Sequence, residues 1–319
     1  MTNRIGRLLS LCAFAIGGVG MGAALAADHG DAPLLADAGR NDARLTDLFA
    51  FTRGENLVLA VCLDPAVPVD ATEYTFSSDL KVSINIDNHS EVRFDNADDV
   101  ATYGGTIVNP NRIRKDVSFK IRFDRLGRPH LRTSGLRRQC RDIRLFAGLR
   151  DDPFIRGPRL GRNVAAIVIE LPLECVVDRH GSHGHNDPDN TLLIWATSDV
   201  PELDGPFQDM AGRALRSMFP ENDAMNQLEP RRHSRELGVA PDVVIFNTDQ
   251  PAAFPNGREL ADDVVDLVGD PRILGNDAPF PTENDRPFLS DFPYLPTPHL
   301  PAGLSADPGF DRRMQPVRE

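Results

Sequence analysis

The sequence contains none of the short motifs that assign a familiar reaction to a chain. Its 319 residues hold no Gly-x-Ser-x-Gly elbow, no His-Glu-x-x-His pair, no Cys-x-x-Cys pair and no glycine loop of the phosphate-binding type. Catalytic groups can still assemble in space from distant parts of a chain. The absence therefore removes any reason to name an enzyme class, and the sequence leaves open whether the protein is an enzyme.

Basic residues are few relative to acidic ones. The chain has 35 Lys and Arg against 47 Asp and Glu, which gives a formal net charge of −12 at pH 7. Nucleic acids and anionic membrane surfaces are bound by clustered Lys and Arg, so this balance argues against both as partners. The arginine-rich stretch 125–144 is a local exception, and its mixture of basic, acidic and apolar residues predicts a solvated strand face.

Long apolar runs are confined to the amino terminus. Arg4 and Arg7 precede an uncharged apolar stretch at 8–25, and Ala24-Leu25-Ala26 is the small-x-small pattern that signal peptidase accepts. We therefore expect residues 1–26 to be a cleaved signal peptide and 27–319 to form one domain in the periplasm or outside the cell. No later run approaches the roughly 20 apolar residues of a membrane span, so no stable membrane insertion is expected after cleavage.

Cysteine is scarce, and three cysteines remain after the expected cleavage. A disulfide persists in an oxidising compartment, but three thiols leave one over. Cys62 lies in an apolar run and is expected to be a buried small side chain, so Cys140 and Cys175 form the favoured pair.

Short β-branched runs dominate the part of the chain from 57 to 200. Segments 57–63, 81–86, 117–123, 164–171 and 192–196 are expected strands, and 243–246 is another. Apolar residues three and four apart predict helices over 206–218 and 257–268. The tail beyond residue 275 is rich in proline and irregular. The prediction is a β-dominated α+β fold in a single large domain, with mainly antiparallel strands and a few helices in the C-terminal half.

Several punctuating motifs occur in the order found in one bacterial family. They are DHGDAPL at 28–34, GLRDDPF at 148–154, AFPNGR at 253–258 followed by DDV at 262–264, ND at 276–277 and FPYL at 292–295. On these motifs the chain resembles the exported family catalogued as domain of unknown function 4331. The resemblance covers nearly the whole chain after the signal peptide. It implies export and a single domain and supplies no catalytic residues.

Histidines provide two candidate metal sites. The loop at 180–189 holds His180, His183 and His185, whose imidazoles could meet one Zn²⁺ or Cu²⁺ with Asp187 as a fourth ligand. The alternative is a flexible hairpin tip whose ligands are not held in place. Cleavage after Ala26 would put His29 third in the chain, where it and the free amine could bind Cu²⁺ or Ni²⁺. The alternative there is a hydrogen-bonded turn.

Acidic pairs and triplets provide oxygen ligands of the kind that Ca²⁺ prefers. They occur at 95–99, at Asp151-Asp152 and at 262–266, but none fits the twelve-residue calcium loop. Helix caps and turns explain these clusters, and Asp151-Asp152-Pro153 is expected to be a turn.

Three hypotheses for the function follow from the sequence. The first is an exported binding or interaction protein, with Zn²⁺, Cu²⁺ or Ca²⁺ as a candidate ligand. The second is a metal-dependent enzyme that uses the His-rich loop, and the third is a structural protein of the cell envelope. The sequence identifies neither a substrate nor a partner.

Overall fold

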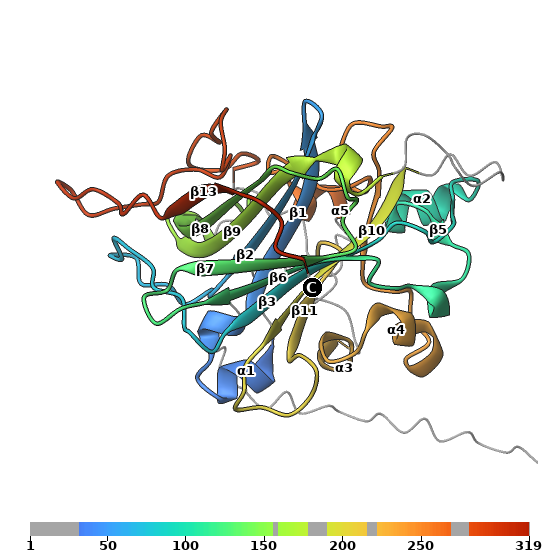
Figure 1. The fold of residues 1–319 in the computed structure, drawn as a ribbon, viewed down its shortest axis with the longest axis horizontal. Helices are drawn as coiled ribbons and strands as arrows, with labels where there is room; N and C mark the ends of the chain where they lie inside the picture. Colours follow the sequence, from blue (N-terminus) through green and yellow to red (C-terminus); the bar gives the residue numbers. More distant parts are fainter. Residues whose placement is uncertain (1–31, 156–158, 178–189, 216–221, 269–280, 319) are drawn as a thin grey trace, which may run out of the picture.

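Two antiparallel sheets form most of the protein. The computed structural model describes residues 32–155, 159–177, 190–215, 222–268 and 281–318 (Figure 1). The first sheet contains, in spatial order, β1 (Leu45–Arg53), β2 (Asn56–Leu63), β9 (Asn163–Pro172), β8 (Ile143–Asp151) and β13 (Phe310–Met314). The second contains β11 (Asp209–Ala211), β10 (Thr191–Asp199), β3 (Lys81–Asp87), β6 (Val117–Phe123) and β7 (Pro129–Ser134), with β12 (Val244–Asn247) also paired to β10. A small third sheet pairs β4 (Val92–Arg93) with β5 (Thr106–Ile107). The predicted β-dominated class is confirmed.

The helices that the structure describes are all short. They are α1 (Pro33–Asp37), α2 (Ala97–Tyr103), α3 (Asn222–Asn226), α4 (Pro230–Glu236) and α5 (Val264–Val268), with 3₁₀ turns η1 (Asn41–Ala43), η2 (Pro110–Arg112) and η4 (Leu173–Cys175). α2 begins where the side chain of Asn96 accepts hydrogen bonds from two backbone N–H groups, and it ends at Gly104 in the left-handed conformation. None of the helices within the described ranges is long and apolar enough to cross a membrane.

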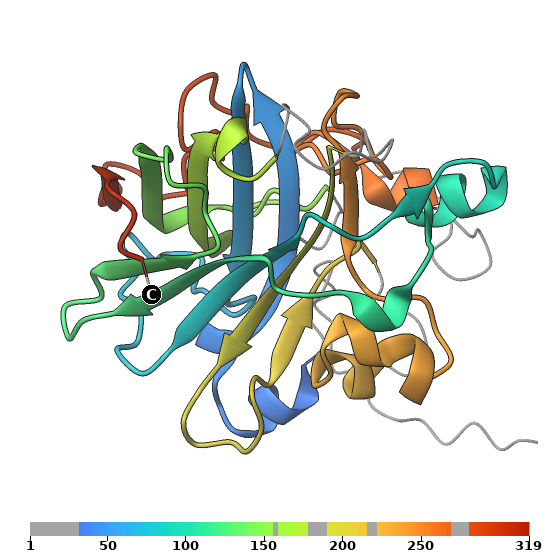
Figure 2. The same ribbon diagram turned by 45° about the vertical axis from the view of Figure 1, so that its right-hand side comes forward.

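Alternating side chains give the two sheets a shared core. In β6 the side chains of Val117, Phe119, Ile121 and Phe123 are buried, while Lys120 is exposed. Apolar residues of β1, β2, β8 and β9 meet those of β3, β6 and β10 in one cluster between the sheets. Figure 2 shows the sheets facing each other with their strands crossing at an angle. Burial of this two-sided cluster is the main stabilising contribution.

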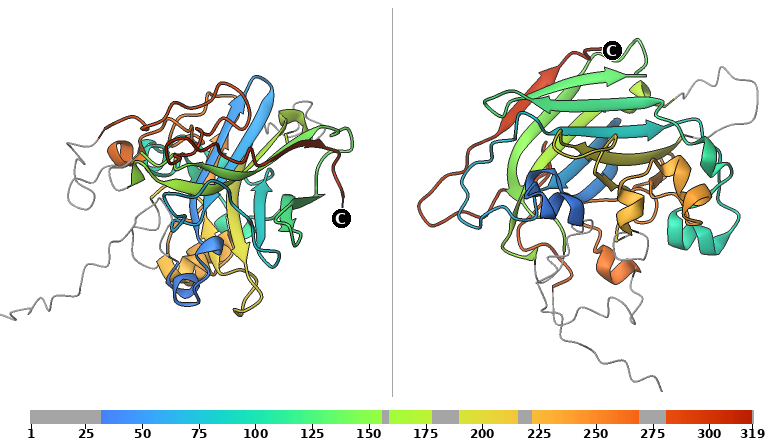
Figure 3. Two further views of the ribbon diagram at one scale, coloured as in Figure 1. Left: turned by 90° about the vertical axis from the view of Figure 1, so that its left-hand side faces the viewer. Right: turned by 90° about the horizontal axis from the view of Figure 1, so that it is seen from below.

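The outer face of each sheet is also covered by other segments of the chain. The strands are therefore apolar on both faces. On the first sheet, Phe51, Val58 and Phe146 pack against Phe292 and Leu295 of the irregular C-terminal segment. On the second, Trp195 belongs to a separate cluster with residues of β4, β11 and β12. The carboxyl end runs from β13 to the edge of β7 (Figure 3), where Arg318 bridges Thr133. The proline-rich tail is irregular over 281–309 but, contrary to the expectation, it then forms strand β13 at the edge of the first sheet.

The two predicted helices are largely wrong. Residues 206–218 contain the short strand β11, because buried Asp209 accepts hydrogen bonds from the backbone N–H of Leu45 at 2.8 Å and of Met210 at 2.9 Å. Residues 257–268 become helical only at α5, because Arg258 pairs with Ala50 of β1 as an extended bridge. In both places long-range contacts outweigh the local helical pattern.

The cysteines occupy two different environments. Cys140 and Cys175, the pair favoured from the sequence, form a disulfide that ties the segment after β7 to η4. Cys62 has a free thiol and is fully buried in β2, where burial raises its pKa. It therefore serves as a small core side chain.

Candidate metal centre

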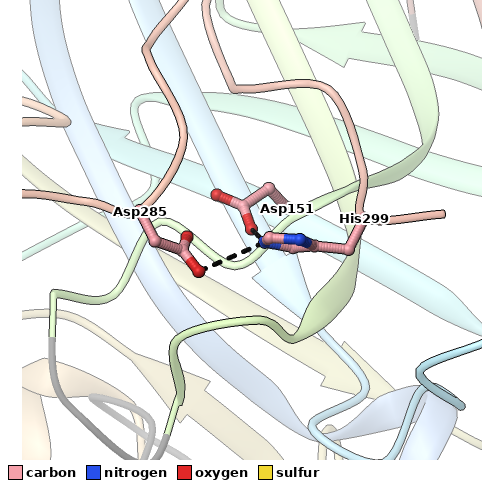
Figure 4. A group of neighbouring side chains, drawn as sticks. All are labelled: Asp151, Asp285 and His299. Atoms are coloured by element: carbon pink, nitrogen blue, oxygen red, sulfur yellow. Dashed lines mark ion pairs between the residues drawn. The ribbon is translucent and has the colours of Figure 1, made fainter.

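The histidine sites predicted from the sequence cannot be placed. His29, His180, His183, His185 and Asp187 all lie outside the described residues. Within those residues, one group of acidic and imidazole side chains brings ligand atoms together closely enough to hold an ion. It consists of Asp151, Asp285 and His299, whose nearest ligand atoms all lie within 4.8 Å of one another (Figure 4).

The ladder between β8 and β9 positions two of these residues. Asp151 ends β8 and lies opposite Asn163, the first residue of β9. The buried amide of Asn163 then holds the backbone of His299 in both directions. Its Oδ1 accepts from the His299 N–H at 2.8 Å, and its Nδ2 donates to the His299 carbonyl at 2.9 Å. One residue of the sheet thus fixes the imidazole beside the neighbouring carboxylate.

The third member comes from the irregular segment that follows residue 280. The backbone N–H of Gly161, a glycine in the left-handed conformation at φ +73°, donates to Oδ2 of Asp285 at 2.6 Å. Next to it, Nδ2 of Asn284 donates to Oδ2 of Asp151 at 2.6 Å. The turn before β9 and the tail are therefore joined at this point, and both carboxylates are held by neutral donors.

The ligand atoms contact one another as close ion-pair partners around the imidazole (Figure 4). Nε2 of His299 lies 2.9 Å from Oδ1 of Asp151 and 3.3 Å from Oδ2 of Asp285. Nε2 and Oδ1 of Asp151 are both buried, and neither makes a well-formed hydrogen bond among the described residues. With ligand bonds of about 2.1 Å, the two separations correspond to angles of roughly 90° and 105° at a shared ion. These are ordinary angles between ligands of one metal ion.

The charge of the Asp151 carboxylate is only partly compensated by Asn284, Arg286 and the contact with His299. Burial, with smaller contributions from Asp285 and Asp152, raises its pKa from 3.8 to about 8, although the hydrogen bond from Asn284 acts in the opposite direction. Asp151 is fully buried. A bound cation would supply the missing compensation, because it favours the charged form of a carboxylate.

The adjacent Asp152, in contrast, has a partner for each of its carboxylate oxygens. Asp152 is buried and forms an ion pair with Arg159, which is itself 1% exposed. The backbone N–H of Phe154 donates to its other oxygen at 3.0 Å. Both oxygens of Asp152 therefore have partners outside the three-residue group, whereas Oδ1 of Asp151 contacts only the imidazole of His299. The expected turn is found only from Asp152 onward, where the Asp152 side chain accepts the backbone N–H of Phe154, because Asp151 itself completes β8 and points into the three-residue group.

Arg286 acts on the far side of the imidazole. Its Nε donates to Nδ1 of His299 at 3.3 Å, so a neutral ring carries its hydrogen on Nε2 in the protein without a cation. A metal ion on Nε2 requires the hydrogen to move to Nδ1, where it would face the Arg286 donor. The long hydrogen bond is thus a contact that binding would have to break.

One side of the group is open to solvent. The side chains of Asp285 and His299 are 26% and 25% exposed, whereas that of Asp151 is 0% exposed. Three protein ligands and an exposed side match centres that keep a position for water, since closed structural sites use four protein ligands.

The other acidic clusters are explained by the fold. Asp98 and Asp99 lie in the first turn of α2, where negative charge is favourable. Oδ2 of Asp262 accepts from the backbone N–H groups of Phe254 and Glu259. These clusters serve as caps and turn residues.

Comparisons with known proteins do not add to this picture. No family model, no curated protein and no solved structure matches the chain. The resemblance based on its motifs therefore stays a prediction, and the interpretation of the site depends on its geometry.

Proposed function

We propose that this protein is an exported protein that binds a divalent first-row transition metal ion through Asp151, Asp285 and His299. The observation that carries the proposal is the convergence of two carboxylates and one imidazole, in which the buried Oδ1 of Asp151 and Nε2 of His299 contact each other but have no well-formed hydrogen bond. Export is supported by the amino-terminal pattern of the sequence.

The mixed set of donors favours particular ions. Imidazole nitrogen and carboxylate oxygen together suit Zn²⁺, Mn²⁺, Fe²⁺ and Co²⁺, whereas Ca²⁺ takes six to eight oxygen ligands. Among the ions expected from the sequence, Zn²⁺ therefore fits this group best and Ca²⁺ fits it least. The proposed ligands also differ from the histidine loop singled out in the sequence.

A metal-dependent hydrolytic enzyme is the second candidate function. Its support is the partial exposure of the Asp285 side chain, on the side of the group from which water would approach a bound ion. A cation in such a site lowers the pKa of its bound water and thereby supplies a nucleophile. Release of product from simple ester and phosphoester substrates by the Zn²⁺-loaded protein, absent in Asp151→Asn, would support this candidate.

Titration of metal-free protein with Co²⁺ tests the binding proposal. Co²⁺ replaces Zn²⁺ in sites of this kind, and its visible absorption reports the ligands directly. We expect one equivalent to bind with a nitrogen- and oxygen-ligand spectrum, and Zn²⁺ to displace it. Asp151→Asn and His299→Gln should each abolish this spectrum.

Two control proteins separate this site from other histidines. His89→Gln removes an exposed imidazole that contacts a single carboxylate, Asp116, at 3.0 Å, and should leave Co²⁺ binding unchanged. Replacing His180, His183 and His185 together by Gln tests the loop. If the one-equivalent spectrum survives Asp151→Asn but disappears in the loop variant, the metal binds at the loop and the proposal is wrong.

A further inference from the structure

A cavity lies beside β10 of the second sheet, and the proposed metal ligands lie elsewhere in the sequence. It has a volume of about 230 Å³ and is bounded by β10, the segment after η2 and the start of α4. Figure 2 shows α4 beside the segment that carries η2, in agreement with their contacts. None of its lining residues belongs to the proposed metal site.

The inner wall of the cavity is formed by a buried tryptophan. Trp195 of β10 lines the cavity and is 1% exposed, and it is the only tryptophan in the chain. Its Nε1–H is buried and has no hydrogen-bond partner among the described residues. Because this nitrogen is inaccessible, the ring of Trp195 forms an apolar floor of the cavity.

The mouth of the cavity carries positive charge in an acidic protein. Arg114, Lys115 and Arg231 line it together with one acid, Glu229. Nζ of Lys115 lies 2.7 Å from Glu229, so these two charges compensate each other. The guanidinium groups of Arg114 and Arg231 form no ion pair or side-chain hydrogen bond within the described part of the chain. The lining therefore has two exposed arginines that form no ion pair with another described residue.

The remaining walls are apolar. Ile113 and Pro230 line the cavity beside the ring of Trp195. Arginine is the side chain best matched to a carboxylate, because its fork can donate two parallel hydrogen bonds. We infer that this cavity binds a small organic carboxylate, with its anionic group toward the arginines and its short apolar body against Trp195, Ile113 and Pro230.

Tryptophan fluorescence gives a direct test, since the only indole of the chain lies in the site. Metal-free protein is titrated at constant ionic strength with butyrate, with butanol as the neutral molecule of equal length and with phosphate as the anion without an apolar body. We expect a saturable change in Trp195 emission with butyrate, none with butanol and weaker binding of phosphate. Asp151→Asn should bind butyrate equally well, which separates this site from the proposed metal centre.

Substitutions identify the contributing residues. The double variant Arg114→Gln/Arg231→Gln should weaken butyrate binding by about tenfold or more, because it removes two charge-assisted donors. The matched control Arg122→Gln/Arg132→Gln removes two exposed arginines from β6 and β7 and should leave the affinity unchanged. Trp195→Phe, followed by calorimetry, should weaken binding while the unfolding transition is retained.

Three results would overturn the inference. The first is no saturable response to butyrate, and the second is an affinity that the Arg114→Gln/Arg231→Gln variant leaves unchanged. The third is tighter binding of butanol or phosphate than of butyrate. The arginine variants keep the test decisive even if Trp195→Phe fails to fold.

Discussion

Neutralising the central carboxylate of the proposed site should stabilise the metal-free protein. An aspartate in the unfolded chain titrates near 3.8, whereas in the folded protein the pKa of Asp151 is about 8. Between these values the folded state holds a proton that the unfolded state has released, so stability falls as the pH rises through this window. A pH of 7 is about three units above the pKa in the unfolded chain. The linkage therefore lowers the free energy of unfolding at pH 7 by roughly 4 kcal/mol. Asp151→Asn removes this penalty and keeps an acceptor for Asn284.

The assay is urea unfolding of chelator-treated protein, followed by far-UV circular dichroism from pH 4 to pH 8. We expect Asp151→Asn to raise the free energy of unfolding by about 2–4 kcal/mol at pH 7 and to have little effect near pH 4. Adding Zn²⁺ should reverse the order, because only the native sequence gains binding energy. Asp152→Asn is the matched control and should destabilise by about 3–5 kcal/mol, since it leaves the buried charge of Arg159 unpaired. Destabilisation by Asp151→Asn at pH 7, or an effect independent of pH, would refute the reasoning.

Three further predictions concern the surroundings of the site and the disulfide. Arg286→Gln should increase the Zn²⁺ affinity severalfold in calorimetry. The substitution removes a positive charge and the donor that opposes a hydrogen on Nδ1 of His299. Weaker binding would contradict this role. Asn163→Ala should lower Zn²⁺ affinity by about 10–100-fold, since it frees the His299 backbone, and an unchanged affinity would show that the amide does not position the imidazole. Replacing Cys140 and Cys175 by Ala should lower stability in urea by about 4 kcal/mol for a separation of 35 residues, and no loss would show that the pair does not constrain the chain.

The sequence predicts β2, β3, β6, β9, β10 and β12 because burial imposes a simple pattern on them, but it does not predict β1, β8 and β13. Residues 117–123 alternate in the sequence and match β6, and the continuous apolar runs match strands that are covered on both faces. The helix over 206–218 fails because Asp209 is fixed by β1, a partner more than 150 positions away that no local pattern reveals.

The proposed site could not be assembled from the sequence for a similar reason. Asp151 and Asp152 are adjacent and have the same chemistry, and only the fold shows that one is paired with Arg159 while the other is not. Asp285 and His299 lie in a proline-rich segment without periodicity, and they approach β8 through hydrogen bonds to Gly161 and Asn163. The one available signal was the pair of aspartates itself, and a turn explained it equally well.

The position of a bound ion tests the central claim most directly. Crystals of the full chain grown with Zn²⁺ and measured at the zinc absorption edge should show an anomalous peak about 2.0–2.2 Å from Nε2 of His299 and from one oxygen each of Asp151 and Asp285. The account predicts that this peak is lost in Asp151→Asn. A zinc peak found only elsewhere, with no zinc bound between these three side chains at saturating Zn²⁺, would contradict it.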